Sequence, residues 1–435
     1  MFKINNISNF FFWLINHERI IVSSSFVGPA CIKKAYLNLF LSSNQSQRIA
    51  SFGSNTLNSG LNVTDLINSN RIKIIISGGG TGGHIFPAIA IANAIKKIEK
   101  NIDILFVGAL GKMEMEKVPA AGYPIEGLWI SGLQRRLTMD NLSFPFKIIS
   151  SITKARKIIN EFKPDVVIGV GGYASGPMLY VAAKKGIPTL IQEQNSFPGL
   201  TNKILAKRVD KICVAYNGME KYFPKEKIIL TGNPVRQDIQ EIANKREQAL
   251  EFFGLHKNKK TLLVIGGSLG SLTINQSIKN GLDKLNKKSI QIIWQTGKSF
   301  YNEAKESINN FENGGINVYD FINKMDYAYA VSDIVISRAG ASAISELCLV
   351  EKPVILIPSP NVAEDHQTKN AMALVHNEAA ILIKDIEANQ KLIDTAIDLL
   401  WNEELKDKLQ NNISKLSIRN SVDIIANEIL MLVKK

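Results

Sequence analysis

The chain has 435 residues, of which 45% are hydrophobic and 21% are charged, a balance typical of globular proteins. Its three cysteines, Cys31, Cys213 and Cys348, are scattered and form neither a disulfide framework nor a metal cluster, so we expect a reducing compartment. No run of about 18 apolar residues occurs, which argues against a membrane-spanning helix.

The net charge of +13 is unevenly distributed along the chain. Residues 1–70 contain 5 basic and 2 acidic residues, residues 71–235 contain 23 and 12, and residues 236–435 contain 24 and 25. A basic half favours an anionic partner such as acidic lipid, pyrophosphate or nucleic acid. A solvated lysine-rich surface explains the same counts equally well.

Residues 1–70 differ from the rest of the chain. They are rich in Ser and Asn, and their only acidic residues are Glu18 and Asp65. Few acids, many serines and scattered basic residues are typical of an organelle transit peptide. We prefer the alternative of an extension without function, or of a start codon placed too early, and leave this segment out of the fold prediction.

A strand, a glycine loop and a helix follow in succession from Arg71. The β-branched residues Ile72–Ile76 predict a buried parallel strand, and Ser77–Gly83 consists of glycine and hydroxyl residues. A helix is expected after Pro87. Glycines allow close approach of a ligand, and the N–H groups of a helix start favour an anion. His84, beside the loop, could exchange a proton near pH 7.

The same alternation continues and then begins a second time. After a Gly/Pro-rich hinge at 231–236, the segment from Thr261 repeats the strand–glycine loop–helix pattern, with Gly266 opening the new loop. This predicts an α/β fold with two doubly wound parallel-sheet domains. An amphipathic last helix, near Ser421–Lys434, is expected to return to the first domain. The other predicted strands are Ile102–Val107, Asp165–Val170, Thr189–Gln192, Lys211–Ala215, Ile228–Leu230, Ile290–Thr296, Ile316–Asp320, Ile334–Ser337 and Pro353–Ile357. The segment Tyr123–Ile130 is also expected to be extended. Helices are expected at Met113–Ala121, Ser143–Phe162 and Met178–Lys185.

Three polar segments follow strands of the second domain. The loop 266–271 predicts a diphosphate site with the Ser268 hydroxyl as a donor, or else a tight turn. In the segment 337–346, Glu346 could accept hydrogen bonds from ribose hydroxyls, or act only as a helix-dipole carboxylate. Arg338 could neutralise a phosphate or form an ion pair. Gln367 could hold sugar hydroxyls, or simply belong to a helix-opening loop.

His84 is the candidate catalytic base, although a single histidine is more often structural. The glycines at 78, 80 and 83, with Asp103 twenty residues further on, also satisfy a dinucleotide fingerprint, which leaves an NAD-dependent oxidoreductase open. Gly-Lys-Ser/Thr does not follow the loop, so it is not a Walker A loop. The sequence contains no clear Asp-x-Asp motif and no metal-binding histidine spacing, so no metal is expected.

The segment 143–159 mixes apolar and basic residues. A basic amphipathic helix of this kind can lie on an anionic membrane. The alternative is a core-facing helix with a solvated basic face. The candidate membrane-facing residues are Lys147, Lys154, Arg156 and Lys157.

Eight ordered pieces of residues 71–435 together closely resemble the MurG family of peptidoglycan N-acetylglucosaminyltransferases, glycosyltransferase family 28. They are GGGTGGHIFPA (78–88), GVGGYASGP (169–177), QEQNSFPGLTNK (192–203), GNPVR (232–236), GGSLG (266–270), DFINKM (320–325), SRAGASAISE (337–346) and EDHQTKNA (364–371). The resemblance implies a GT-B fold, in which two Rossmann-like domains face each other across a cleft.

The resemblance also implies an activity. It implies an inverting, metal- and cofactor-independent transfer of GlcNAc from UDP-GlcNAc to the MurNAc 4-hydroxyl of lipid I, undecaprenyl-pyrophosphoryl-MurNAc-pentapeptide, to give lipid II. The enzyme would lie at the cytoplasmic face of the inner membrane, on an anionic surface, with other cell-wall enzymes as candidate partners and no nucleic acid. Targeting to an organelle through residues 1–70 is the alternative location.

The resemblance implies a division of the chain and a set of site residues. Residues 71–235 would form the acceptor domain, 236–417 the UDP-GlcNAc domain, and 418–435 the returning helix. His84 would lie near the acceptor hydroxyl as the base, and the backbone of Ile322 would read uracil. The implied donor contacts are Thr81, Gly82, Gly83, Asn195, Arg236, Ser268, Ile322, Ala341, Ser342, Ala343, Ile344, Ser345, Glu346 and Gln367.

Two residues depart from the family pattern. Leu269 stands where the family often has glutamine, and Ser271 where it often has alanine. The lost amide at position 269 could weaken one donor contact. Other functions that remain open are a glycolipid glycosyltransferase, a UDP-GlcNAc epimerase and a catalytically silent scaffold that recruits cell-wall enzymes.

Overall fold

The computed structural model describes residues 71–131, 144–235, 239, 242–267, 269–311, 315–362 and 365–433. Its first sheet is wholly parallel, in the order β3-β2-β1-β4-β5-β6-β7. Strand β1 lies between β2 and β4, where Ile76 is in register with Phe106 and Ile168. The strands are β1 (Ile72–Ser77), β2 (Ile102–Ala109), β3 (Ile125–Leu128), β4 (Val166–Gly169), β5 (Thr189–Glu193), β6 (Lys211–Val214) and β7 (Ile228–Leu230).

The second sheet repeats this topology, in the order β10-β9-β8-β11-β12-β13. Both sheets therefore have the strand order of a Rossmann-like fold, with the first strand next to the fourth. The sequence prediction missed β13, because two residues are too few to show a periodicity. The strands are β8 (Thr261–Ile265), β9 (Gln291–Gln295), β10 (Ile316–Tyr319), β11 (Ile334–Ser337), β12 (Val354–Leu356) and β13 (Ile381–Leu382).

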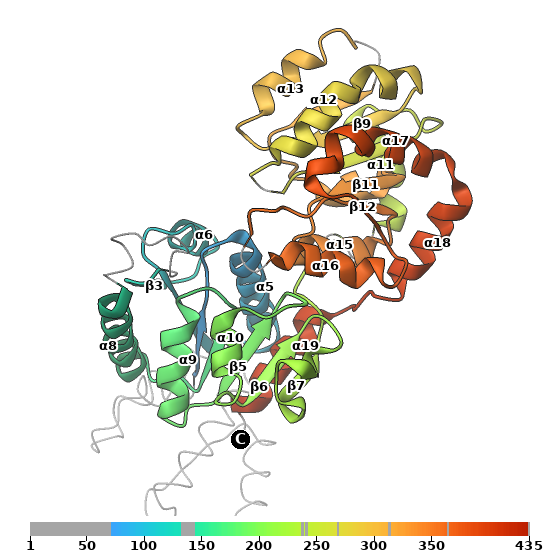
Figure 1. The fold of residues 1–435 in the computed structure, drawn as a ribbon. Helices are drawn as coiled ribbons and strands as arrows, with labels where there is room; N and C mark the ends of the chain where they lie inside the picture. The colour runs from blue at the N-terminus through green and yellow to red at the C-terminus, as the bar shows by residue number, and fades with distance from the viewer. Residues whose placement is uncertain are drawn as a thin grey trace, which may run out of the picture. The chain divides into compact units, whose positions relative to one another are not determined.

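Helices cover both faces of each sheet (Figure 1). In the first sheet, α5 covers one face and α8 and α9 the other, and fully buried strand residues such as Ile74 and Ile75 alternate between these two cores. The helices are α5 (Gly82–Ile98), α6 (Glu114–Ala120), α8 (Phe144–Phe162), α9 (Ser175–Lys184), α10 (Leu200–Leu205), α11 (Arg246–Phe253), α12 (Leu272–Lys287), α13 (Tyr301–Ser307), α14 (Met325–Val331), α15 (Ala341–Val350), α16 (His366–Val375), α17 (Ala388–Trp401), α18 (Glu403–Ser414) and α19 (Ser421–Val433).

The last helix of the chain, α19, packs against α5 of the first sheet (Figure 1, red and blue). Ile425 and Ile429 are fully buried in the same core cluster as Ile91 and Ile95. Lys211 of β6 also forms an ion pair with a glutamate of α19. The apolar face of α19 therefore completes one face of the sheet formed by residues 72–230.

Two helices begin earlier than the sequence suggested. Helix α5 begins at Gly82, before Pro87, because the N–H groups of His84 and Ile85 both donate to the Thr81 carbonyl and close the first turn without the proline. Helix α9 begins at Ser175, within the glycine-containing loop predicted at 171–177, and not at Met178. In both cases the glycine loop is shorter and the helix start lies closer to the strand. Within the described residues, no helix is both long and apolar enough to cross a bilayer.

Candidate active site

The two glycine loops of the first sheet pack against each other. The N–H of Gly79 donates to the carbonyl of Gly171 at 3.2 Å. A Cβ atom on Gly172, which has a φ of +85°, would lie 2.3 Å from the carbonyl oxygen of Gly79. Neither backbone could approach this closely with a side chain at that position.

The ring of His84 lies at this junction, in the first turn of α5. Its Nδ1 atom is 2.9 Å from Oε1 of Gln194, which follows β5, and a Cβ atom on Gly171 would lie 2.7 Å from the ring. Burial lowers the pKa of His84 below its ordinary value, while the contact with Gln194 acts in the opposite sense. The imidazole is therefore held neutral, which a general base requires.

The other residues expected in this loop form the start of α5. Thr81 is the N-cap, with extended backbone and no capping bond from its side chain, and Gly82 and Gly83 are the first helical residues. Their N–H groups belong to the turn that has no intrahelical acceptor, which makes this end of α5 suited to an anion or a sugar hydroxyl.

The donor-binding segment expected at 341–346 forms the N-terminal turns of α15, with Gly340 as the N-cap. Glu346 accepts a hydrogen bond from the Tyr329 hydroxyl at 3.2 Å. Ser345 accepts one from Asn233 at 2.9 Å. The hydroxyl oxygen of Ser342 is buried without a hydrogen-bond partner among the described residues, as expected of a group that would bond to a bound polar ligand.

Gln295, which the sequence prediction missed, joins two other expected donor segments. Its Nε2 donates to the carbonyl of Gly267 at 3.1 Å, and its Oε1 accepts the N–H of Ile322 at 2.9 Å. Only its position at the end of β9 could have indicated it. Because the N–H of Ile322 already has this partner, recognition of uracil by this residue would fall to its carbonyl.

The two departures from the family pattern have different environments. Leu269 is 84% exposed. The Ser271 hydroxyl accepts the N–H of Ile274 at 3.3 Å and caps α12, a contact that alanine could not make. The predicted donor residues Ser268 and Arg236 lie outside the described residues.

Asn195 and Gln367 both have protein partners here. Oδ1 of Asn195 accepts from Asn370 at 3.1 Å, and Oε1 of Gln367 accepts the N–H of Ser359 at 2.9 Å. Asn370, another residue that the prediction missed, also accepts the N–H of Ser196 at 2.9 Å. Asn370 lies three residues after Gln367 in the same motif, and this position is the feature of the sequence that could have indicated it.

One alternative from the sequence is wrong. Asp103 is in register with Lys73 near the start of β2 and forms an ion pair with Arg71 at 2.9 Å, so it lies at the opposite end of the strands from the glycine loop. It cannot serve as the ribose-binding acid of a dinucleotide fold. Arg338 forms an ion pair with Asp385, which is one of its two predicted roles.

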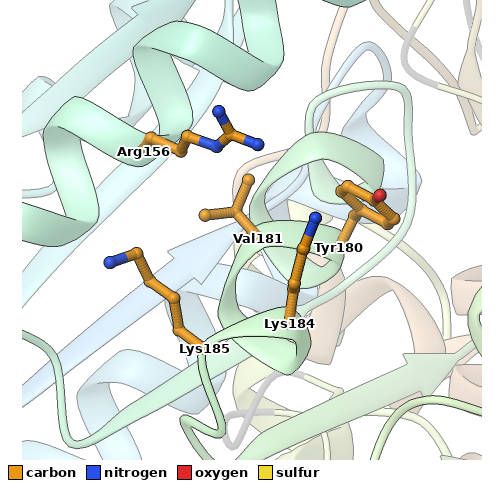
Figure 2. Close-up of a pocket in the computed structure, with 5 residues that line it drawn as sticks. All are labelled: Arg156, Tyr180, Val181, Lys184 and Lys185. Carbon is orange, nitrogen blue, oxygen red and sulfur yellow. The ribbon is translucent and has the colours of Figure 1, made fainter.

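Three of the four basic residues of α8 have a polar side-chain partner among the described residues. Lys154 forms an ion pair with Glu126 at 3.1 Å, and Lys157 lies 3.8 Å from Glu161. Lys147 donates to the Ser131 hydroxyl at 3.0 Å. A hollow of about 200 Å³ is lined by Arg156, Tyr180, Val181, Lys184 and Lys185. Figure 2 shows the side chains of Arg156, Lys184 and Lys185 around Val181. The core-facing side of α8 consists of Ser151, Ala155, Ile158 and Ile159.

Comparison with known proteins identifies the family. The N-terminal domain model of glycosyltransferase family 28 matches residues 74–214, and its C-terminal domain model matches residues 261–427. A protein of Parabacteroides distasonis is 56% identical over 84% of this chain and 99% of its own length. One of Cytophaga hutchinsonii is 54% identical over 83% of this chain and 97% of its own length. Both are named UDP-N-acetylglucosamine–N-acetylmuramyl-(pentapeptide) pyrophosphoryl-undecaprenol N-acetylglucosamine transferase.

Solved structures agree with this identification. The crystal structure of Acinetobacter baumannii MurG is 25% identical, with a TM-score of 0.68, and the match covers 83% of this chain and 99% of that one. A UDP-GlcNAc 2-epimerase from Neisseria meningitidis, 16% identical over 83% of this chain and 100% of its own, has a TM-score of 0.57 and shows the fold alone. The fold is GT-B, as the sequence predicted, and the chain belongs to glycosyltransferase family 28.

Proposed function

We propose that this protein transfers GlcNAc from UDP-GlcNAc to the MurNAc 4-hydroxyl of lipid I and so forms lipid II. The observation that carries the proposal is the 56% identity, over 84% of this chain, to a protein that bears the name of that transferase. The epimerase alternative rests on a fold shared with a protein that is 16% identical, and a shared fold does not establish a shared activity.

In the proposed reaction, one group of residues removes the acceptor proton and another stabilises the leaving group. The acceptor oxygen attacks C1 of GlcNAc, its bond to C1 forms as the bond from C1 to the diphosphate oxygen breaks, and UDP leaves. His84 takes the proton of the attacking hydroxyl. Charge on the departing diphosphate is stabilised by backbone N–H groups of the loop 266–271 and by the Ser268 hydroxyl.

The first turns of α15 and Glu346 hold the nucleoside in this proposal. Glu346 accepts hydrogen bonds from the ribose hydroxyls, and Gln367 contacts the sugar. The buried Ser342 hydroxyl has no hydrogen-bond partner in the part of the chain that the structure describes, which supports a polar ligand at this helix start. Residues 71–235 form the acceptor domain, 236–417 the donor domain and 418–435 the helix that returns to the first.

The acceptor carries a polyprenyl chain, so the protein must meet a membrane. We propose that it docks peripherally on the anionic cytoplasmic face of the inner membrane through the exposed face of α8. The side chains of Phe146 and Ile149 are 68% and 64% exposed there, next to the basic residues of that helix. Exposed apolar and basic groups on one helix support an interfacial position.

The decisive experiment measures UDP release from UDP-GlcNAc with and without a short-chain lipid I analogue, without added divalent metal. The variants are His84→Ala and Glu346→Ala, with exposed His376→Ala and Glu404→Ala as matched controls. Acceptor-dependent release that is lost in the first pair and kept in the controls is the expected result. Consumption of UDP-GlcNAc without acceptor would favour an epimerase or hydrolase, and no binding of UDP-GlcNAc would overturn the donor site.

A further inference from the structure

The buried amides behind His84 form a continuous chain of hydrogen bonds. Asn233 donates through Nδ2 to the carbonyl of Gln194 at 3.0 Å, and Gln192 donates through Nε2 to Oδ1 of Asn233 at 3.1 Å. Gln194 donates through Nε2 to the carbonyl of Val170 at 2.8 Å and also contacts Oε1 of Gln192. All three amides are at most 2% exposed, so water cannot replace these partners.

This chain fixes the orientation of each amide in turn. Backbone carbonyls only accept, so the Asn233 atom beside the carbonyl of Gln194 must be its NH₂ group. Its oxygen then faces Gln192, which must donate to it and present its own oxygen to Gln194. The Gln194 NH₂ group is therefore directed at Gln192 and at the carbonyl of Val170.

The remaining Gln194 oxygen, Oε1, faces Nδ1 of His84 at 2.9 Å. Because Oε1 can only accept, Nδ1 must carry the hydrogen, and the lone pair of the neutral ring must lie on Nε2. Building on the proposed function, we propose that Gln194 is a positioning residue that holds His84 in the Nδ1–H tautomer and presents Nε2 as the proton acceptor.

The neutrality of Gln194 distinguishes it from a carboxylate partner. A carboxylate at this position would stabilise the imidazolium and raise the pKa of His84, whereas an amide orients the ring with a weaker effect. The charged groups that act on His84 from neighbouring elements are Glu114, which raises its pKa, and His366, which lowers it. The Val170 backbone also raises the pKa of His84.

The direct test is the tautomer of His84 in the full chain, read from ¹⁵N shifts of the imidazole nitrogens. Only five histidines are present, and His84→Ala assigns the signal. The expected parent spectrum has a protonated Nδ1 and an unprotonated Nε2 near pH 7.5. A protonated Nε2 would overturn the inference, whatever the activity of the enzyme, so this result is separate from a failure of the proposed function.

The second test compares Gln194→Met and Gln194→Glu with exposed Gln248→Met as the control. Gln194→Met keeps the volume but loses the acceptor, so kcat should fall by about 10-fold or more, while KM for UDP-GlcNAc changes by less than about 2-fold. Gln194→Glu restores an acceptor and should regain part of kcat, with the acid limb of the pH profile moved to higher pH. Equal kcat values and unshifted profiles in all three variants, with acceptor-dependent activity in the parent, would overturn the role of Gln194 alone.

Discussion

The carboxylate of Glu114 accepts the backbone N–H of Gly80 at 2.9 Å, although 34 residues separate them in sequence. Its other oxygen accepts the N–H of Ala109 at 3.0 Å, at the end of β2. Glu114 is 1% exposed, and a Cβ atom on Gly79 would lie 2.2 Å from its carboxylate. One buried side chain therefore fixes the glycine loop that precedes His84 relative to the neighbouring strand.

Glu114→Gln should loosen this loop. The amide can accept only one of the two N–H groups, and its NH₂ group would face the other, so the free energy of unfolding should fall by about 1–3 kcal/mol. Displacement of the loop should also lower kcat by about 10-fold or more, because catalysis depends on the position of the base. Thermal unfolding and the UDP-release assay measure the two effects.

Glu116→Gln is the matched control on the same helix. Glu116 has a 78% exposed side chain that forms an ion pair with neighbouring Lys117, so both measurements should stay close to those of the parent. Equal losses in the two variants would contradict a specific role for Glu114.

The pH dependence of the reaction should reflect the environment of His84. Burial lowers its pKa from the ordinary value of 6.5, so the ring remains neutral and able to accept a proton at pH 6.5. The acid limb of kcat/KM should therefore have an apparent pKa below 6.5. A pH profile of UDP release between pH 5 and 9 tests this, and a limb centred at 6.5 or above would contradict it.

The unfolded chain binds a proton at position 84 as pH falls through 6.5, whereas the folded chain does not. The contribution of His84 to stability is therefore fully present above the pKa that this histidine has in the unfolded chain. It is lost as the pH falls toward the lower pKa that the histidine has in the folded chain. The free energy of unfolding of the parent should fall more steeply below pH 6.5 than that of His84→Ala, and equal slopes would contradict the lowered pKa.

The sequence predicted the sheets better than the helix starts. Strands β8 and β11 begin and end as predicted, because each is buried along its whole length and reads as a continuous apolar segment. The partly exposed edge strand β7 also has its predicted bounds. Helix α5 was predicted too late, because a proline was read as the helix start. The closed first turn around Thr81 depends on a backbone geometry that residue types do not reveal.

The candidate site was only partly accessible to the same reasoning. Glycine loops and the helix start at Ala341 have local signatures, so they were found. Glu114, Gln194 and Gln295 act on residues 34, 110 and 27 positions away, and no local pattern marks such a partner. Their roles depend on which strand ends lie side by side, which only the sheet order provides.

Gln295→Leu should weaken donor binding specifically. The substitution leaves the Gly267 carbonyl and the Ile322 N–H without their partner, each at a cost of about 1–3 kcal/mol if it stays buried. The two segments would then lose their fixed spacing, so the Kd for UDP should rise by about 10-fold or more. Isothermal titration with UDP measures this, and Gln248→Leu, at an exposed position, should leave the Kd unchanged. An unaltered Kd for UDP in Gln295→Leu would show that Gln295 does not contribute to donor binding.

Charge reversal on α8 should lower binding to anionic vesicles. The proposed docking face includes Lys154, Arg156 and Lys157, and each basic residue near such a surface contributes about 1 kcal/mol. Reversal of all three should therefore reduce binding to phosphatidylglycerol vesicles by more than about 10-fold, while the Kd for soluble UDP stays the same. Sedimentation with vesicles, in low and high salt, measures the effect.

The single variants should differ, because the three residues are not equally neutralised. Lys154 and Lys157 each have a carboxylate within 4 Å, whereas Arg156 has no carboxylate partner among the described residues and lies beside Lys184 and Lys185. Arg156→Glu should thus weaken vesicle binding more than Lys157→Glu. The control reverses three exposed lysines of the second sheet's domain, Lys287, Lys288 and Lys298, which changes the net charge equally. If that control lowers binding as much as the α8 variant, the attraction is a property of the total charge, and α8 is not the docking face.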